Sequence, residues 1–153
     1  MKMDVRIINS ILKSTVRVFT EAVNMKIEFE KPQIAKELAK GYDLVTLVGF
    51  NGSLSGNLVY AFDMQVALNI VGKMMGMPYN QLDDLAMSAI GELANMISGN
   101  IATNMEQIGK PIDITPPSVI LGKEIHVNVD GVILKIITKY EDKTFEVDMV
   151  LRE

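Results

Sequence analysis

Two residues with chemically useful side chains, Glu92 and Asn95, lie three positions apart in the segment SAIGELANMISGN, residues 88–100. A carboxylate accepts hydrogen bonds and pairs with a cation, whereas an amide both donates and accepts. Successive residues of a helix turn by about 100°, which aligns small and polar residues on one side. The aligned residues are Asp84, Ser88, Glu92, Asn95 and Gly99. This row predicts a surface that contacts polar groups of another molecule.

The glycines of this segment argue that its polar side has a purpose. Gly91 and Gly99 each cost roughly 1 kcal/mol relative to alanine inside a helix. Gly99 lies one turn beyond Asn95, where the missing side chain leaves the amide unobstructed and lets another backbone approach closely. The alternative interpretation is a solvated helix face whose serine, glutamate and asparagine only keep the protein in solution.

Other kinds of catalytic site have little support in the sequence. The chain has no cysteine and one histidine, His126, which alternates with Ile125 and Val127 in a strand-like run. Disulfides and thiolate metal sites are therefore excluded, and no serine, histidine and aspartate constellation can be recognised. An unrelated hydrolase would need more converging acidic or histidine residues than this chain has.

Length, composition and charge limit the classes of protein to which this chain can belong. The chain of 153 residues suits one domain, residues 1–153, and its 48% hydrophobic and 22% charged residues are typical of a globular protein. The formal net charge of −4 argues against a nucleic-acid partner. No apolar run reaches the roughly 18 to 20 residues of a membrane span, and the start MKMDVRII lacks the core of a signal peptide. We therefore expect a cytoplasmic protein.

Helices are predicted to position the polar row. Apolar spacing predicts helices over about residues 4–23, 63–76 and 81–108, with Asp4 as the first N-cap and Gly109 ending the last helix. The apolar stripe expected along the last helix is Leu82, Leu85, Ala89, Ile90, Leu93, Ile97, Ile101, Met105 and Ile108. The polar row would lie opposite this stripe.

β-Rich runs fill most of the remaining sequence. LVTLVGF and LSGNLVYAF predict a hairpin whose tight turn begins at Asn51-Gly52. EIHVNV, GVILKII and TFEVDMVL predict a final β-meander, whereas residues 28–43 read as a loop or an edge strand. The fold class is therefore α+β, an antiparallel sheet covered by long helices. A repeated order of long helix, Lys-Pro dipeptide and extended runs raises the hypothesis of an internal pseudo-duplication.

The segment SAIGELANMISGN, followed by GKPIDITPPSVI, resembles the CheC/CheX family of chemotaxis phosphatases. The family pattern is serine or aspartate, three residues, glutamate, two residues, asparagine, and then a later proline. Ser88, Glu92, Asn95 and Pro117 occupy those positions. The likeness covers nearly the whole chain, including LVTLVGFNGSLSGNLVYAF and GVILK, and is greatest for the CheX-like members.

The resemblance implies hydrolysis of the aspartyl-phosphate on a CheY-type response regulator. Asn95 would enter the partner's site and orient the attacking water, and Glu92 would pair with a partner lysine. Ser88 and Gly99 would contact the partner, while Pro117 would brace the chain beside the helix. The partner would carry the Mg²⁺, so the chain needs no cofactor or metal site of its own. The family likeness also implies a homodimer.

A second Glu-x-x-Asn pair, Glu21 and Asn24, repeats the spacing near the end of the first predicted helix. Arg17 stands where the pattern has serine or aspartate, and an asparagine at a helix end is more often a C-cap. We therefore expect one site per chain, as in CheX-like members.

An alternative function keeps the same fold without the chemistry. Flagellar-switch domains are related to this family, and a module like them would dock a response regulator without hydrolysing its phosphoryl group. The presence of both Glu92 and Asn95 favours the enzyme.

Overall fold

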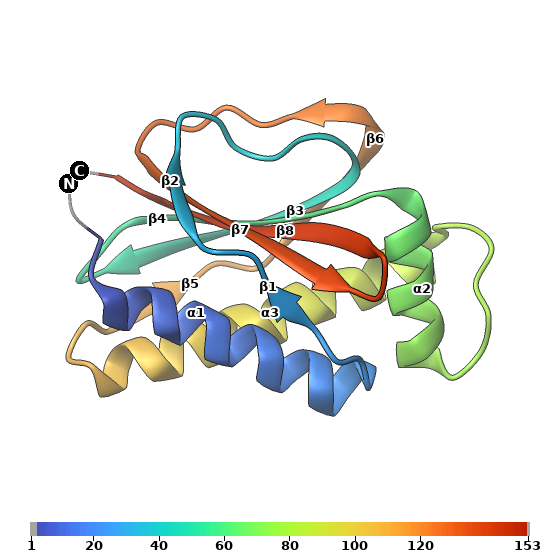
Figure 1. Cartoon of the computed structure of the whole chain (residues 1–153), viewed down its shortest axis with the longest axis horizontal. Helices are drawn as coiled ribbons and strands as arrows, with labels where there is room; N and C mark the ends of the chain where they lie inside the picture. The colour runs from blue at the N-terminus through green and yellow to red at the C-terminus, as the bar shows by residue number, and fades with distance from the viewer. Residues whose placement is uncertain (1–2, 153) are drawn as a thin grey trace.

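The computed structural model describes residues 3–152, which form an antiparallel sheet with long helices against one face (Figure 1). The helices are α1 (Val5–Val18), its π-helical continuation η1 (Phe19–Val23), α2 (Met64–Met75) and α3 (Asp84–Gln107). The strands are β1 (Glu28–Phe29), β2 (Gln33–Ala35), β3 (Lys40–Gly52), β4 (Gly56–Phe62), β5 (Ile112–Ile114), β6 (Ser118–His126), β7 (Val132–Tyr140) and β8 (Lys143–Leu151). The predicted α+β class is therefore confirmed.

α1 and α2 begin where the sequence predicts, whereas α3 begins at Asp84, three residues after the predicted start at Gln81. Asp4, Asp63 and Asp83 are the N-caps, and each side chain accepts a hydrogen bond from a backbone N–H in its helix. Asn24 ends η1 in the left-handed conformation, with φ of 58°, and is therefore a C-cap. Within residues 3–152, every helix is too short or too polar to cross a membrane.

The expected apolar stripe of α3 is wrong at Leu85. The central members of the stripe, such as Ile90 and Ile97, are buried, whereas Leu85 is 55% exposed. At about 100° per residue, Leu85 lies about 140° around the helix from Ile90, which turns it away from the sheet. Its exposure therefore follows from helical geometry.

The hairpin of β3 and β4 is confirmed, but its predicted tight turn is wrong. Asn51 and Gly52 remain in β3, because they pair with β5 on the side away from β4. The Ser53 N–H then donates to the carbonyl oxygen of Pro111 at 3.0 Å. This extra pairing keeps Asn51 and Gly52 in β3, where Gly52 has a positive φ of 146°. It also fastens the end of the hairpin to the chain that follows α3.

The predicted β-meander is wrong at its first strand. β7 and β8 form the expected hairpin, but only the first three residues of the run EIHVNV lie in a strand, at the end of β6, and β6 pairs with β3. The strand order is β1-β7-β8-β4-β3-β5, with β2 also on β7 and β6 also on β3. Residues 28–43 supply the short strands β1 and β2, at an edge of the sheet as predicted, and also the start of β3. Alternation therefore predicted neither the bounds of β6 nor its neighbour.

Apolar side chains are buried on both faces of the sheet. The larger cluster lies under the helices and contains Phe19, Phe62 and Phe145, whose ring centroids are 5.1 and 5.3 Å apart in the two contacting pairs. The smaller cluster contains Leu38 and Val150 and includes the connection between β2 and β3. Because α3 packs into the larger cluster, its position against the sheet is fixed by hydrophobic burial.

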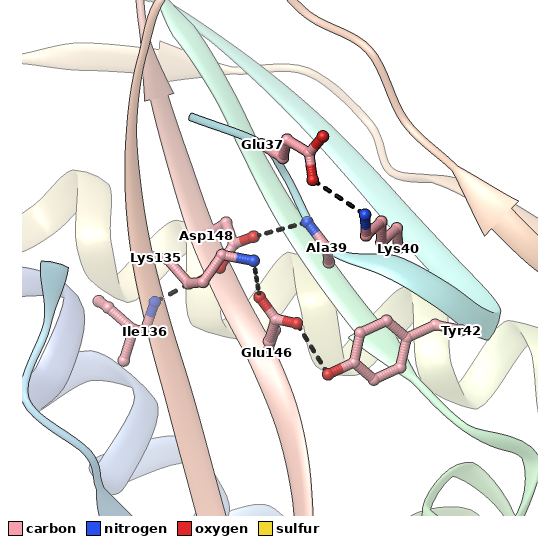
Figure 2. A network of polar contacts seen from close by, with 8 residues as sticks. All are labelled: Glu37, Ala39, Lys40, Tyr42, Lys135, Ile136, Glu146 and Asp148. Carbon is pink, nitrogen blue, oxygen red and sulfur yellow. Dashed lines mark hydrogen bonds and ion pairs between the residues drawn. The ribbon is translucent and has the colours of Figure 1, made fainter. Parts of the chain in front are cut away.

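A buried polar network accompanies the smaller cluster (Figure 2). Glu146 accepts hydrogen bonds from Lys135 Nζ at 2.9 Å and from the Tyr42 hydroxyl at 2.8 Å. Asp148 is fully buried and accepts a hydrogen bond from the Ala39 N–H at 3.1 Å. Burial, and secondarily the Glu146 carboxylate, raise the pKa of Asp148 to about 7.

The raised pKa of Asp148 predicts a loss of stability as the pH rises. The folded state binds this proton more tightly than the unfolded chain, in which the carboxyl has its ordinary pKa of 3.8. The resulting stabilisation is full below the ordinary pKa and is lost as the pH rises to about 7. Relative to Asp148→Asn, the wild type should lose at most about 1.4 kcal/mol of unfolding free energy per pH unit in this window.

Chemical denaturation of both proteins across this range checks the prediction. The difference between their free energies of unfolding should change up to about pH 7 and become constant above it. A difference that is independent of pH throughout would contradict the shifted pKa.

Candidate active site

The predicted polar row lies along the exposed side of α3. Ser88, Glu92 and Asn95 are exposed, Gly99 is partly buried and Gly91 is buried. The opposite side of the helix places its apolar residues in the larger core cluster. The core therefore holds the helix in place, while Glu92 and Asn95 are free to meet another molecule.

A groove of about 880 Å³ runs beside this row. One wall belongs to α3 and the other to the chain between β5 and β6. Its lining includes four of the predicted site residues, Ser88, Glu92, Asn95 and Pro117. Gly99, the fifth predicted residue, does not line this groove. The groove, referred to below as the proline groove, thus combines the Glu-x-x-Asn pair with the later proline.

Gly91 allows the two walls of the proline groove to approach each other. A Cβ atom at this position would lie 3.3 Å from Val119 Cγ2 and 3.8 Å from Pro117 Cγ. The first distance is tighter than ordinary van der Waals contact, so alanine would push against the start of β6. Gly91 is not part of the polar row, and its close contact with the opposite wall gives a structural reason for a glycine at this position.

Thr115 holds the second wall against the sheet. Its N–H donates to the Gly49 carbonyl oxygen at 2.8 Å, and the Gly49 N–H donates to Thr115 Oγ1 at 2.9 Å. The Thr115 hydroxyl also lies 3.3 Å from the Pro116 carbonyl oxygen, to which it donates. Pro116 and Pro117 then restrict the backbone that follows. No pattern in the sequence pointed to Thr115, because its partner Gly49 is distant along the chain.

A second groove, of about 350 Å³, lies on the other side of Asn95. We call it the α1 groove, because α3 residues Asn95 and Gly99 face Arg17 and Glu21 of the first helical segment across it. A Cβ atom at Gly99 would have nothing within 4 Å. Packing among residues 3–152 therefore does not require glycine at position 99, whereas alanine at position 91 would press against Val119.

The charged side chains that line the proline groove, Asp84 and Glu92, are acidic. In the described part of the chain, no group of three or more histidine, cysteine, aspartate or glutamate residues could hold a metal ion. The groove therefore offers a carboxylate for a cation and an amide for hydrogen bonding.

Three residues that the sequence disfavours as site residues, Glu21, Asn24 and His126, lie apart from the proline groove. Asn24 caps the end of η1, and Glu21 pairs with Arg17 through Oε1 and Nε at 3.4 Å. His126 is exposed at the last position of β6. None of the three lines the proline groove.

Comparisons with known proteins find relatives along the whole chain. Residues 44–139 match the family described as chemotaxis phosphatase CheX. The chain is 38% identical over 152 residues to the CheY-P phosphatase CheX of Thermotoga maritima, covering 98% of each protein. A CheC-like superfamily protein from Shewanella sp. PV-4 has a TM-score of 0.90 and 28% identity, covering 99% of this chain and all of that one. The CheX–CheY–BeF3–Mg²⁺ complex from Borrelia burgdorferi has a TM-score of 0.84 and 26% identity, covering 99% of this chain and 100% of that one.

Proposed function

The chain belongs to the CheX family of chemotaxis phosphatases, and we propose that it hydrolyses the aspartyl-phosphate of a CheY-type response regulator. The observation that carries this proposal is the presence of exposed Glu92 and Asn95 in one groove with Ser88 and Pro117. The relatives support it, since one is a CheY-P phosphatase and another forms a complex with CheY.

In the proposed reaction, Asn95 enters the receiver's site and orients a water molecule. The water oxygen forms a bond to phosphorus as the bond between phosphorus and the aspartyl oxygen breaks, which releases inorganic phosphate and the receiver carboxylate. An acyl phosphate is already activated, so this step requires mainly positioning and charge stabilisation. An amide can hold the water by donating and accepting hydrogen bonds, and the chain needs no general base.

Glu92 has a different role in the proposal. Its carboxylate pairs with a lysine of the receiver, which positions the receiver over α3. Ser88, one turn earlier, contacts the same surface, and Pro117 keeps the opposite wall rigid. The Mg²⁺ belongs to the receiver, in agreement with the Mg²⁺ of the relative's complex. The homodimer expected from the resemblance stays a prediction.

Catalytic turnover distinguishes this function from the docking alternative. A phosphorylated receiver is mixed with a small molar fraction of the chain, and the remaining aspartyl-phosphate is followed over time. An enzyme should accelerate the decay of the whole receiver population. A module that only docks would affect no more receiver than it can bind at once, and unchanged decay despite measurable binding would favour that module.

Gly99 provides a prediction that separates stability from function. Gly99→Ala should stabilise the protein by roughly 1 kcal/mol, because the new Cβ meets open space within a helix. Gly99→Arg should keep the fold but raise KM for the phosphorylated receiver, because its side chain occupies space beside Asn95. Thermal unfolding and steady-state turnover measure the two effects.

Gly91→Ala is the matched control for the stability effect. Its new Cβ would press against Val119, so the variant should gain much less unfolding free energy than Gly99→Ala. If Gly99→Arg leaves KM unchanged, the receiver does not approach this part of α3.

A further inference from the structure

Asn95 lies between two grooves that together form a continuous surface. It lines both the proline groove and the α1 groove. A third groove, of about 560 Å³, continues along α1 and α3 and shares Arg17 with the α1 groove. Lys13 lines this third groove. A partner that covers Asn95 therefore reaches the proline segment on one side and α1 on the other.

The charges on the two sides of Asn95 are opposite. On the proline side, the charged lining residues are Asp84 and Glu92. On the α1 side, Lys13 and Arg17 accompany a single carboxylate, Glu21. The surface is thus acidic on one side of the proposed catalytic amide and basic on the other.

The basic side is available to a partner. Arg17 is 66% exposed and pairs with Glu21 through Nε at a long 3.4 Å. Lys13, one turn earlier on α1, is exposed as well. An exposed ion pair such as Arg17–Glu21 contributes little to the stability of the monomer. Both cations can therefore turn toward an acidic group without a large cost to the fold.

We propose that the phosphorylated receiver covers both sides at once and that Lys13 and Arg17 bind an acidic side chain beside its phosphorylated aspartate. This inference rests on the proposed function and adds the determinant of orientation. With a receiver lysine over Glu92 and a receiver carboxylate over Arg17, opposite charges meet on both sides of Asn95. Turning the receiver by half a turn would bring like charges together, which disfavours that orientation. Arg17, which departs from the family's serine or aspartate, thereby acquires a role.

A double charge reversal tests the inference. Lys13→Glu with Arg17→Glu should raise KM for the phosphorylated receiver about tenfold or more, while kcat at saturation stays near the wild-type value. The control is Lys31→Glu with Lys36→Glu, which makes the same charge change around β2. This strand pairs with β7, at the other end of the strand order from β5, the strand beside α3. The control should keep a KM close to that of the wild type, and added salt should raise the wild-type KM more than that of the reversed variant.

A second variant and a binding assay cover the other outcomes. Lys13→Gln with Arg17→Gln avoids new repulsion with Glu21 and should show a smaller increase in KM. Affinity for the beryllofluoride-treated receiver is measured for each protein by calorimetry, because binding can be observed without turnover. A change in KM and affinity no larger than that of the control would overturn the orientation, while turnover by the wild type would leave the phosphatase standing. Wild-type binding without turnover, weakened by the reversal, would support the surface and reject the phosphatase.

Discussion

Asn95→Ala is expected to reduce kcat for receiver dephosphorylation by a factor on the order of 10² or more, the effect of removing one group that stabilises a transition state. Alanine keeps the helix and removes the amide that would orient the water. Because the Asn95 side chain is exposed, the variant should fold like the wild type. Decay of the phosphorylated receiver, followed at saturating receiver concentration, measures the effect.

Asn69→Ala in α2 is the matched control, since it removes the same amide from a different helix that lines neither the proline groove nor the α1 groove. Binding of the receiver to Asn95→Ala should be largely retained, because the contacts of Glu92 and the groove walls remain. An Asn95→Ala variant with nearly full turnover would remove Asn95 from the mechanism.

Glu92→Ala is expected to weaken receiver binding about tenfold or more and to lower kcat as well. The substitution leaves the receiver lysine without its partner and removes one contact that positions the phosphoryl group over Asn95. Glu92→Gln keeps the side-chain length but loses the charge, so it should behave more like alanine than like the wild type. Calorimetric titration and single-turnover decay separate the effects on binding and on chemistry.

Glu106→Ala provides the control for Glu92, because Glu106 is also an exposed glutamate of α3 but lies near the end of the helix, outside the proline groove. Its affinity and rate should match the wild type. If Glu92→Ala shows both unchanged affinity and unchanged rate, the proposed lysine contact does not exist.

Local signals in the sequence identified all three helices and most of their ends. Asp4 and Asp63 carry side chains that cap a first turn, and Gly109 supplies the positive φ of 77° that follows the last helical turn. The start of α3 was predicted at Gln81, whereas its N-cap is Asp83. The apolar spacing also separated the buried side of α3 from its polar row. Leu85 was misplaced because a count of apolar residues does not enforce the 100° rotation between them.

Long-range pairing could not be read from the same signals. Asn51-Gly52 is a favourable turn sequence, but β5 keeps both residues in β3 by pairing from the other side. The alternating run EIHVNV supplies only the last three residues of β6, and the partner of β6 is β3. Both errors concern contacts between segments far apart in the chain, which local propensity does not specify. The internal pseudo-duplication stays a prediction.

The candidate site was predicted in part by geometry and in part by resemblance. Helical periodicity alone aligned Ser88, Glu92 and Asn95, whereas only the family pattern connected Pro117 with them. The two glycines carry the same helix-propensity cost, but a Cβ at Gly91 would lie 3.3 Å from Val119 Cγ2, whereas a Cβ at Gly99 would have nothing within 4 Å. The anchoring of the proline segment by Thr115 depends on tertiary structure and had no local signal.

We propose that the Asn95 amide acts at the receiver's phosphoryl group. A crystal structure of this chain with a beryllofluoride-treated receiver, which mimics the phosphorylated form, tests it most directly. The Asn95 side chain should lie within about 3 Å of the fluoride group or of a water in line with it, and a receiver lysine should contact Glu92. A receiver bound to another face, or bound here with Asn95 turned away from the mimic, would contradict it.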